Sequence, residues 1–116
     1  MDLTIEMRQV GAVTVIVCAG RIVFGEESTA FREHLKRILV THKQVVLNLA
    51  GVVYIDSGGL GTLVGVYSSA RAVGADIKLA GLGPRLRDLL HITKLVTVFT
   101  IYDNEQQAVA AFARPA

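Results

Sequence analysis

Residues 56–61, Asp-Ser-Gly-Gly-Leu-Gly, place a hydroxyl between a carboxylate and three glycines. The preceding run, residues 44–49, is apolar and β-branched, which is typical of a buried strand. After the segment, apolar residues recur at the spacing of one helix face: Leu60, Leu63, Val64 and Tyr67. Ser57 therefore lies where a strand gives way to a helix, and its hydroxyl is a candidate site of covalent modification.

We expect Ser57 to cap this helix. A hydroxyl at that position accepts hydrogen bonds from the backbone N–H groups of Gly59 or Leu60, which a helix start leaves unsatisfied. A phosphate on Ser57 would meet the same donors and the positive end of the helix dipole. Its added charge, beside Asp56, would disfavour docking against another protein. The pattern predicts a serine whose phosphorylation is compatible with the fold and releases a partner.

Residues 54–61 resemble the motif of the STAS domains of anti-sigma factor antagonists, which runs apolar-Asp-Ser-Ser/Thr-Gly-Leu-Gly after a buried strand. The resemblance extends over nearly the whole length of the chain. It includes a two-strand start with Gly20 after the second strand, residues 45–61, residues 89–93, and residues 98–102 before a terminal helix.

The resemblance implies a non-enzymatic regulatory binding module. In that family the serine after the aspartate is phosphorylated by an anti-sigma factor that is itself an ATP-dependent serine kinase, and a metal-dependent phosphatase reverses the step. The unphosphorylated protein binds the anti-sigma factor and frees the sigma factor. By position the acceptor is Ser57, and the partner-binding residues are Asp56, Ser57, Gly58, Gly59, Leu60 and Gly61. Asp56 is expected to present the hydroxyl and the glycines to let the partner approach the backbone; Thr62 is the nearest alternative hydroxyl.

The sequence departs from the family pattern at two places. Gly58 stands where the family usually has a second hydroxyl residue or alanine, and glycine is less favourable than alanine in a helix by about 1 kcal/mol. Residues 20–23 read Gly-Arg-Ile-Val where many antagonists carry Gly-Glu-Leu-Asp, so Arg21 and Val23 replace two acidic groups. The second departure favours the main alternative, a STAS scaffold subunit of a signalling or lipid-transport complex in which Ser57 is never phosphorylated. A small-ligand or nucleotide-sensing domain is a third interpretation.

Enzymatic motifs do not fit the sequence. The glycines do not match Gly-x-Gly-x-x-Gly, because Val64 stands where the dinucleotide fingerprint needs its third glycine. They do not match a Walker loop either, because no Lys-Ser/Thr pair follows them. Gly-x-Ser-x-Gly is absent because Ile55 occupies the first glycine position. Asp-Ser-Gly at the end of a strand also fits a plain turn and helix cap, and the family resemblance decides against that interpretation.

Other reactive side chains receive ordinary structural interpretations. The three histidines, His34, His42 and His91, lack the spacing of zinc ligands, so no metal or cofactor is expected. Cys18, in a hydrophobic strand, is interpreted as a small buried hydrophobe. Arg85 and Arg87, near the Gly-Leu-Gly-Pro segment, form at most a weak anion-binding patch.

Composition indicates a single domain, residues 1–116, because a chain of this length with 52% hydrophobic residues can bury a sizeable core. The net charge of +2 is interspersed along the chain, which does not favour nucleic acid or an anionic membrane as a partner. The longest apolar stretch is too short to span a membrane. With one cysteine and no secretory signal, the cytoplasm is the expected compartment, and the oligomeric state stays open.

Periodicity predicts alternating strands and helices. We expect strands at residues 3–8 and 13–18 joined as a hairpin, a third-layer strand at 75–80 and a last strand at 96–101. A helix with a buried face formed by Phe31, Leu35, Ile38 and Leu39 is expected after the hairpin, with Ser28 and Thr29 as candidate caps.

Two further helices complete the prediction. Pro84 opens the first, anchored by Leu86, Leu89 and Leu90, and the second covers residues 104–112 with Val109 and Phe112 in the core. Residues 114–116 are expected to fray. The fold class is α/β, a STAS-like mixed sheet with helices mainly on one face and alternating strand and helix order in the second half.

Overall fold

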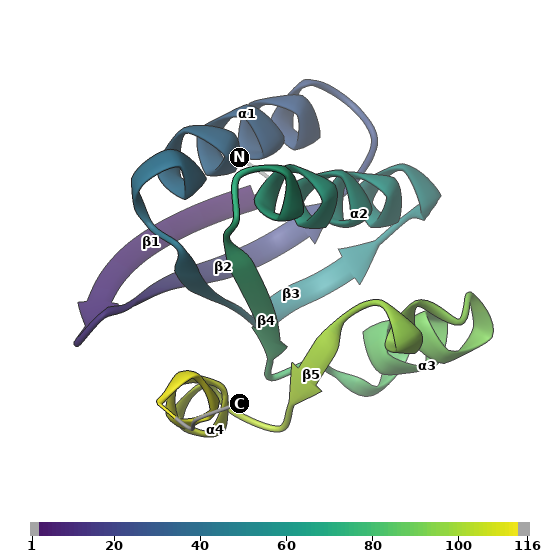
Figure 1. Cartoon of the computed structure of the whole chain (residues 1–116). Coiled ribbons are helices and arrows are strands. Elements are labelled where there is room, and N and C mark those ends of the chain that lie inside the picture. The colour runs from purple at the N-terminus through teal and green to yellow at the C-terminus, as the bar shows by residue number, and fades with distance from the viewer. Residues whose placement is uncertain (1–2, 114–116) are drawn as a thin grey trace.

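The computed structural model describes residues 3–113 and contains one mixed sheet with helices against it (Figure 1). The elements in chain order are β1 (Leu3–Val10), β2 (Val13–Ile22), α1 (Glu26–Thr41), β3 (Gln44–Ile55), α2 (Ser57–Ala72), β4 (Asp76–Ala80), α3 (Pro84–Ile92), the 3-10 helix η1 (Leu95–Thr97), β5 (Thr100–Tyr102) and α4 (Glu105–Phe112). The five strands lie in the order β1-β2-β3-β4-β5, with β1 antiparallel to β2 and the other neighbours parallel. The predicted fold class is confirmed.

The hairpin prediction is also confirmed. Val10 pairs with Val13 across a two-residue turn, and Gly11 takes a φ of 60°, which glycine adopts without steric cost. The second strand continues past Cys18 to Ile22, so Gly20 lies within β2 and not after it. Likewise β3 runs to Ile55, but it pairs with β4 only over its first residues, Gln44 to Asn48.

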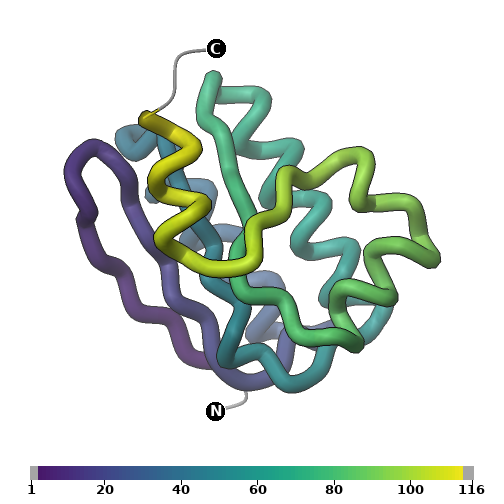
Figure 2. The backbone as a smooth tube through the Cα atoms, turned by 90° about the horizontal axis from the view of Figure 1, so that it is seen from below, coloured from purple at the N-terminus to yellow at the C-terminus, as the bar shows by residue number. Residues whose placement is uncertain are grey.

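Two hydrophobic clusters cover the two faces of the sheet. The larger lies under α1 and α2, which pack side by side on one face, and it contains the predicted α1 positions Phe31, Leu35, Ile38 and Leu39 together with Leu60 and Leu63 of α2. The smaller lies under α4 on the other face, where Ala108 is fully buried and Val109 and Phe112 pack against it (Figure 2). Apolar periodicity therefore identified the faces of the main helices correctly.

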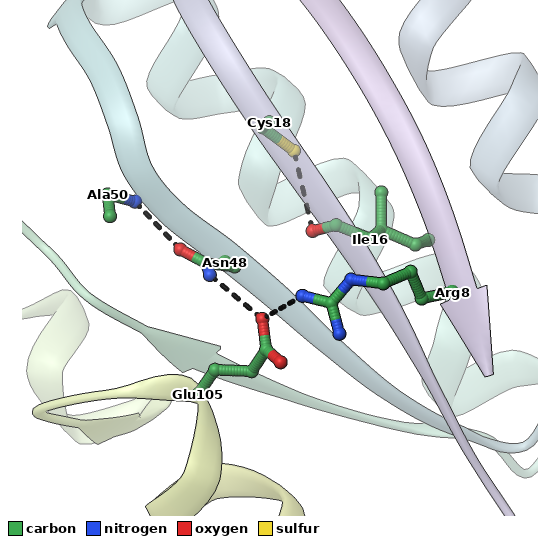
Figure 3. A network of polar contacts seen from close by, with 6 residues as sticks. All are labelled: Arg8, Ile16, Cys18, Asn48, Ala50 and Glu105. Carbon is green, nitrogen blue, oxygen red and sulfur yellow. Dashed lines mark hydrogen bonds and ion pairs between the residues drawn. The ribbon is translucent and has the colours of Figure 1, made fainter. Parts of the chain in front are cut away.

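A polar network fixes α4 across the sheet (Figure 3). Glu105, in the first turn of α4, accepts a hydrogen bond at Oε1 from the Arg8 guanidinium of β1 at 2.6 Å and another from the Asn48 amide of β3 at 3.0 Å. Asn48 in turn accepts the backbone N–H of Ala50 at 3.0 Å. These hydrogen bonds hold the pKa of Glu105 below its ordinary value, with the Arg8 hydrogen bond as the main cause.

The expected last strand at 96–101 is wrong. Lys94 adopts a left-handed conformation after α3, and η1 then occupies residues 95–97 with Leu95 and Val96 packed against the larger cluster. The strand itself, β5, starts only at Thr100, because its pairing with β4 is limited to Lys78–Ala80. The segment expected as a third-layer strand is β4, which lies in the same sheet between β3 and β5.

The candidate caps of the first long helix are wrong as well. The helix begins at Glu26 after Gly25, which makes no side-chain capping bond. Ser28 lies inside α1, is buried, and donates its hydroxyl to the Val23 carbonyl, while Thr29 donates to the Gly25 carbonyl at 3.2 Å. Pro84 opens α3 as predicted, with Leu86 and Leu90 buried and Leu89 partly buried. Residues 114–116, expected to fray, lie outside the described residues.

Candidate functional site

The junction between β3 and α2 is the site that the sequence singled out. Strand β3 ends at Ile55 and α2 begins at Ser57, so Ser57 is the first helical residue and Asp56 the N-cap. The Asp56 carboxylate accepts the backbone N–H of Gly59 at 2.7 Å, which is the capping bond. The prediction that Ser57 caps the helix is therefore wrong.

Asp56 outcompetes Ser57 because its carboxylate has a second task. The backbone N–H of Phe24, in the loop between β2 and α1, donates to both carboxylate oxygens at 3.1 and 3.2 Å. The Asp56 backbone N–H also donates to the Ile22 carbonyl at 3.3 Å. A carboxylate has two oxygens with about four acceptor positions, so it receives both N–H groups more readily than a hydroxyl with a single oxygen and two lone pairs. Asp56 thus joins the start of α2 to the end of β2.

The carboxylate at this position is ionised at neutral pH. The hydrogen bond from Gly59 is the largest cause of a pKa below the ordinary value of Asp56, and the hydrogen bond from Phe24 acts in the same direction. Hydrogen bonds to the charged form of a carboxylate stabilise it relative to the neutral form. A negative charge therefore stands directly before Ser57.

Ser57 itself is exposed to solvent. Within residues 3–113 no hydrogen bond engages its hydroxyl, and it stands in the first turn of α2, at the positive end of the helix dipole. The alternative acceptor, Thr62, is partly buried and donates its hydroxyl to the Gly58 carbonyl at 3.1 Å. Of these two hydroxyls, Ser57 is the one open to an incoming reactant.

The three glycines have different surroundings. A Cβ on Gly59 would overlap the Ile22 carbonyl oxygen, so this residue lets α2 approach β2 closely. A Cβ on Gly58 would lie 2.5 Å from the Cβ of Phe24. Around Gly61 the corresponding position is open. The chain itself occupies the space beside Gly58 and Gly59, whereas Gly61 leaves the helix backbone accessible from outside.

Large apolar side chains are exposed on both sides of this junction. Phe24 is 83% exposed and Val53 72% exposed, and Tyr54 is 44% exposed with the Arg21 guanidinium 5.2 Å from the centre of its ring. Phe24 is a residue that sequence reasoning missed, because no local pattern shows that the loop after β2 is drawn to Asp56. The structure shows that Phe24 lies next to Gly58, and the sequence alone does not reveal this contact.

Two grooves flank Ser57. The first, of about 630 Å³, is mostly apolar and is formed by residues 52–55 of β3, by Gly83 and by one side of α3, including the exposed Arg85. The second, of about 700 Å³, lies between the first turns of α1 and α2 and includes Phe24, Gly58, Gly61 and Thr62. Ile55, two residues before the serine, lines the first groove, and Gly58, directly after the serine, lines the second, so Ser57 stands between the two.

The remaining candidates lie apart from this site. Cys18 is fully buried in β2, and burial raises the pKa of its thiol to about 12, which disfavours the reactive thiolate. Arg87 lies 3.6 Å from Asp103, in an ion pair on the surface. His34 lies in α1, His42 directly follows that helix and His91 lies in α3, and in the described part of the chain no three metal-ligating side chains gather.

Comparison with known proteins places the chain in a family. The STAS domain profile matches residues 4–108, and the protein belongs to the STAS domain family. Over 112 residues it is 28% identical to an anti-sigma F factor antagonist of Paenibacillus polymyxa, with 94% of each chain covered. It is 32% identical to a STAS-domain containing protein of Pseudomonas aeruginosa over 91 residues, covering 78% of this chain and 89% of that protein.

A solved structure shares the fold. It is that of the Bacillus cell fate determinant SpoIIAA in its phosphorylated form, with a TM-score of 0.71, 17% identity, and coverage of 94% of this chain and 99% of that one. None of the helices described here has the length and apolar character needed to cross a bilayer.

Proposed function

We propose that this protein is an anti-sigma factor antagonist, a regulatory binding module switched by phosphorylation of Ser57. The observation that carries the proposal is an exposed serine at the first position of α2, beside an ionised Asp56 and between two grooves. The name of a relative that matches over 94% of the chain, an anti-sigma F factor antagonist, supports it. The unphosphorylated protein binds an anti-sigma factor with serine kinase activity and thereby frees a sigma factor.

The docking surface centres on Asp56, Ser57, Gly58 and Gly61. Gly59 and Leu60 belong to the predicted partner-binding set but are buried, so they act by fixing the helix start. Exposed apolar side chains complete the surface, chiefly Phe24 and Val53. Large apolar residues surrounded by polar ones are typical of protein interfaces.

Phosphorylation weakens this contact by electrostatics. The Ser57 oxygen takes the γ-phosphoryl group of ATP, ADP leaves, and a base of the kinase receives the hydroxyl proton. The product carries roughly −1.5 to −2 additional charges next to the Asp56 carboxylate. Docking would then require a dense negative charge to be desolvated, which is costly. A metal-dependent serine phosphatase restores the binding form.

The surface also constrains the partner. Arg21 and Val23 stand where many antagonists of the family have acidic residues, so a partner that reads acidic groups at those positions finds none. Recognition therefore depends more on the apolar side chains and on the helix start. The protein has a binding role and not an enzymatic one, and it acts in the cytoplasm, where sigma factors function.

The test is to incubate the purified protein with its candidate kinase-like partner, ATP and magnesium, and to map any phosphate by peptide mass spectrometry. Phosphate on Ser57, accompanied by release of the partner, is the expected result. Ser57→Ala should bind and resist release by ATP, and Ser57→Asp should bind more weakly. Thr62→Val is the matched control and should behave like the unaltered protein. Equal affinity of the two Ser57 variants would contradict a docking surface at this helix.

One observation favours a second candidate, a scaffold subunit of a signalling or lipid-transport complex. The exposed apolar side chains beside Ser57 form a docking surface that works without modification, and Arg21 and Val23 stand where many antagonists have acidic residues. Stable binding to a partner with ATP present and no phosphate on Ser57 would support this role.

A further inference from the structure

Among residues 3–113, strand β1 forms a free edge of the sheet. In the strand order it has β2 as a neighbour on one side, and in Figure 2 its trace runs along the outside of the molecule. Most of its residues are exposed, including Met7 at 52% and Val10 at 39%. It contains no proline, and its pairing with β2 has no register shift. These are the properties that leave an edge open to pairing with another strand.

The hairpin determines which backbone groups point outward. A two-residue turn closes on a hydrogen-bonded pair, here Val10 with Val13, and such pairs alternate along an antiparallel ladder. The even-numbered residues of β1 therefore bond to β2, and the odd-numbered residues direct their N–H and C=O groups away from the sheet. The N–H of Leu3 agrees, because it donates to the Glu27 side chain of α1 at 3.4 Å. Beyond Leu3, the outward groups of Ile5, Met7 and Gln9 face the open edge.

We propose that two copies of this protein associate through β1, antiparallel and around a two-fold axis at Met7, to form a continuous sheet across both copies. In this register Met7 lies opposite Met7 of the second copy, and Ile5 lies opposite Gln9. The residues whose backbone groups point toward the second copy are odd-numbered in both copies, so the outward N–H donors of one copy meet the outward C=O acceptors of the other. Glu6 of each copy lies opposite Arg8 of the other, and Thr4 lies opposite Val10.

Charge selects this register over its neighbours. Only shifts of two residues keep odd-numbered residues facing each other, because the side-chain period of a strand is two. One such shift places Glu6 opposite Glu6 of the second copy, and the other places Arg8 opposite Arg8. Like charges directly opposite one another destabilise a strand pair, whereas opposite charges stabilise it. The order Glu-Met-Arg is thus self-complementary about its central residue, as a two-fold interface requires.

The intramolecular role of Arg8 is compatible with this contact. One of its terminal nitrogens donates to Glu105, and a guanidinium has five N–H donors in a planar fork. Arg8 is half exposed while it makes the Glu105 contact, so the remaining donors are accessible to Glu6 of the second copy. The association does not involve Ser57, and it stands independently of the proposed function.

Association is measured by sedimentation velocity over a wide range of protein concentration. A monomer and dimer equilibrium is expected for the unaltered protein. Met7→Pro removes the central outward N–H and should abolish the dimer, since proline is tolerated on an edge strand where its nitrogen faces solvent. Met7→Leu keeps the donor and should dimerise. Circular dichroism and thermal unfolding establish that both variants are folded. A monomer at every concentration, or a dimer that survives Met7→Pro, would overturn the proposal.

Two further variants test the register. Glu6→Lys places like charges at both ends of the pair and should weaken association by roughly tenfold relative to Glu6→Gln. Met7→Cys should form a disulfide between copies under mild oxidation, because directly opposite residues lie within disulfide reach. Gln9→Cys should not, because residue 9 faces residue 5 of the other copy. Crosslinking of Gln9→Cys and not of Met7→Cys would overturn the register.

Discussion

Two carboxylates join distant segments of this protein, and they do so with different donors. Asp56 receives backbone N–H groups from Gly59 and from Phe24, at the strand-to-helix junction. Glu105 receives the side chains of Arg8 and Asn48, on the face covered by α4 (Figure 3). Both carboxyl groups have pKa values below their ordinary ones. The two sites therefore do similar structural work by different means.

The two kinds of donor differ in whether the donating position requires a particular side chain. A backbone donor is present whatever the side chain is, so Asp56 fixes the position of residue 24 and leaves its side chain 83% exposed for a partner. Glu105 binds side-chain donors, so it needs arginine and asparagine at two particular positions. Backbone anchoring suits a surface whose side chains must stay exposed, as the proposed docking surface requires, whereas side-chain anchoring suits a contact within the fold.

The largest change in stability is expected for a substitution that disturbs the packing of α2 against β2 at the Asp56 site and leaves the carboxylate in place. In Gly59→Ala the new methyl group would overlap the Ile22 carbonyl oxygen. Because the backbone of α2 or β2 must then move, the substitution should destabilise the fold by about 3 kcal/mol or more. Gly61→Ala is the matched control in the same helix turn. Its position is open, and helix propensity predicts a gain of about 1 kcal/mol. Urea unfolding of both variants measures the difference; similar effects would contradict the close approach of α2 to β2.

Removing the Asp56 carboxylate should have the next largest effect. Asp56→Ala leaves the N–H groups of Gly59 and Phe24 without their acceptor, so the midpoint of thermal unfolding should fall by several degrees. Asp56→Asn retains an acceptor oxygen and should recover much of the loss at neutral pH. Because the pKa of Asp56 is lowered by folding, its contribution is complete above the ordinary value of 3.8 and is lost as pH falls through the folded value. The asparagine variant should lack this acid dependence.

Glu105→Gln tests the other half of the comparison. It weakens charge-assisted hydrogen bonds from Arg8 and Asn48 and should cost about 1 kcal/mol at neutral pH. The sign of the pH effect is the same as at Asp56: the contribution of the wild-type residue is complete above its ordinary pKa of 4.5 and declines as pH falls further. Glu33→Gln, in an exposed pair with Lys36 at 3.9 Å, is the control and should change stability little. Equal effects at the two positions would argue against the network.

The smallest net effect is expected for Gly58→Ala. The new methyl group would lie 2.5 Å from the Cβ of Phe24 and should displace this loop, while the better helix propensity offsets about 1 kcal/mol of the cost. In a Phe24→Gly background the Cβ is gone and the nearest atom of residue 24 is its Cα at 3.0 Å, so the same substitution should cost clearly less. A double-mutant cycle by urea unfolding measures this coupling. Additive effects would show that the two residues do not interact.

The sequence predicted the faces of the long helices and the position of the site because those signals are local. Phe31, Leu35 and Leu39 recur at helical spacing and are buried, as expected. The helix cap was assigned to the wrong residue, since Asp and Ser are both good N-caps and stand side by side. The choice depends on the N–H of Phe24, which arrives from another part of the chain.

The end of the sheet was mispredicted for a related reason. Residues 96–101 have the composition of a strand, but the backbone N–H groups of Val98 and Phe99 donate to the Leu95 carbonyl, and pairing with β4 begins only at Thr100. Leu95 and Val96 contribute to the core from a 3-10 turn instead. Hydrophobic content indicated correctly that these residues are partly buried, and the local hydrogen bonds to the Leu95 carbonyl, which composition does not reveal, determined the backbone conformation.

The unequal pairing of β3 has a dynamic consequence. Past Asn48 its recorded sheet partner within residues 3–113 is β2 alone, so the part of the strand that leads to Ser57 has hydrogen-bonded support on one side. Such segments open locally at a lower free energy than strands bonded on both sides. Amide hydrogens of residues 52–55 should therefore exchange with solvent faster than those of residues 45–48. Ser57 lies two residues beyond this less supported end of β3, so local opening there would expose the serine further while the core stays folded.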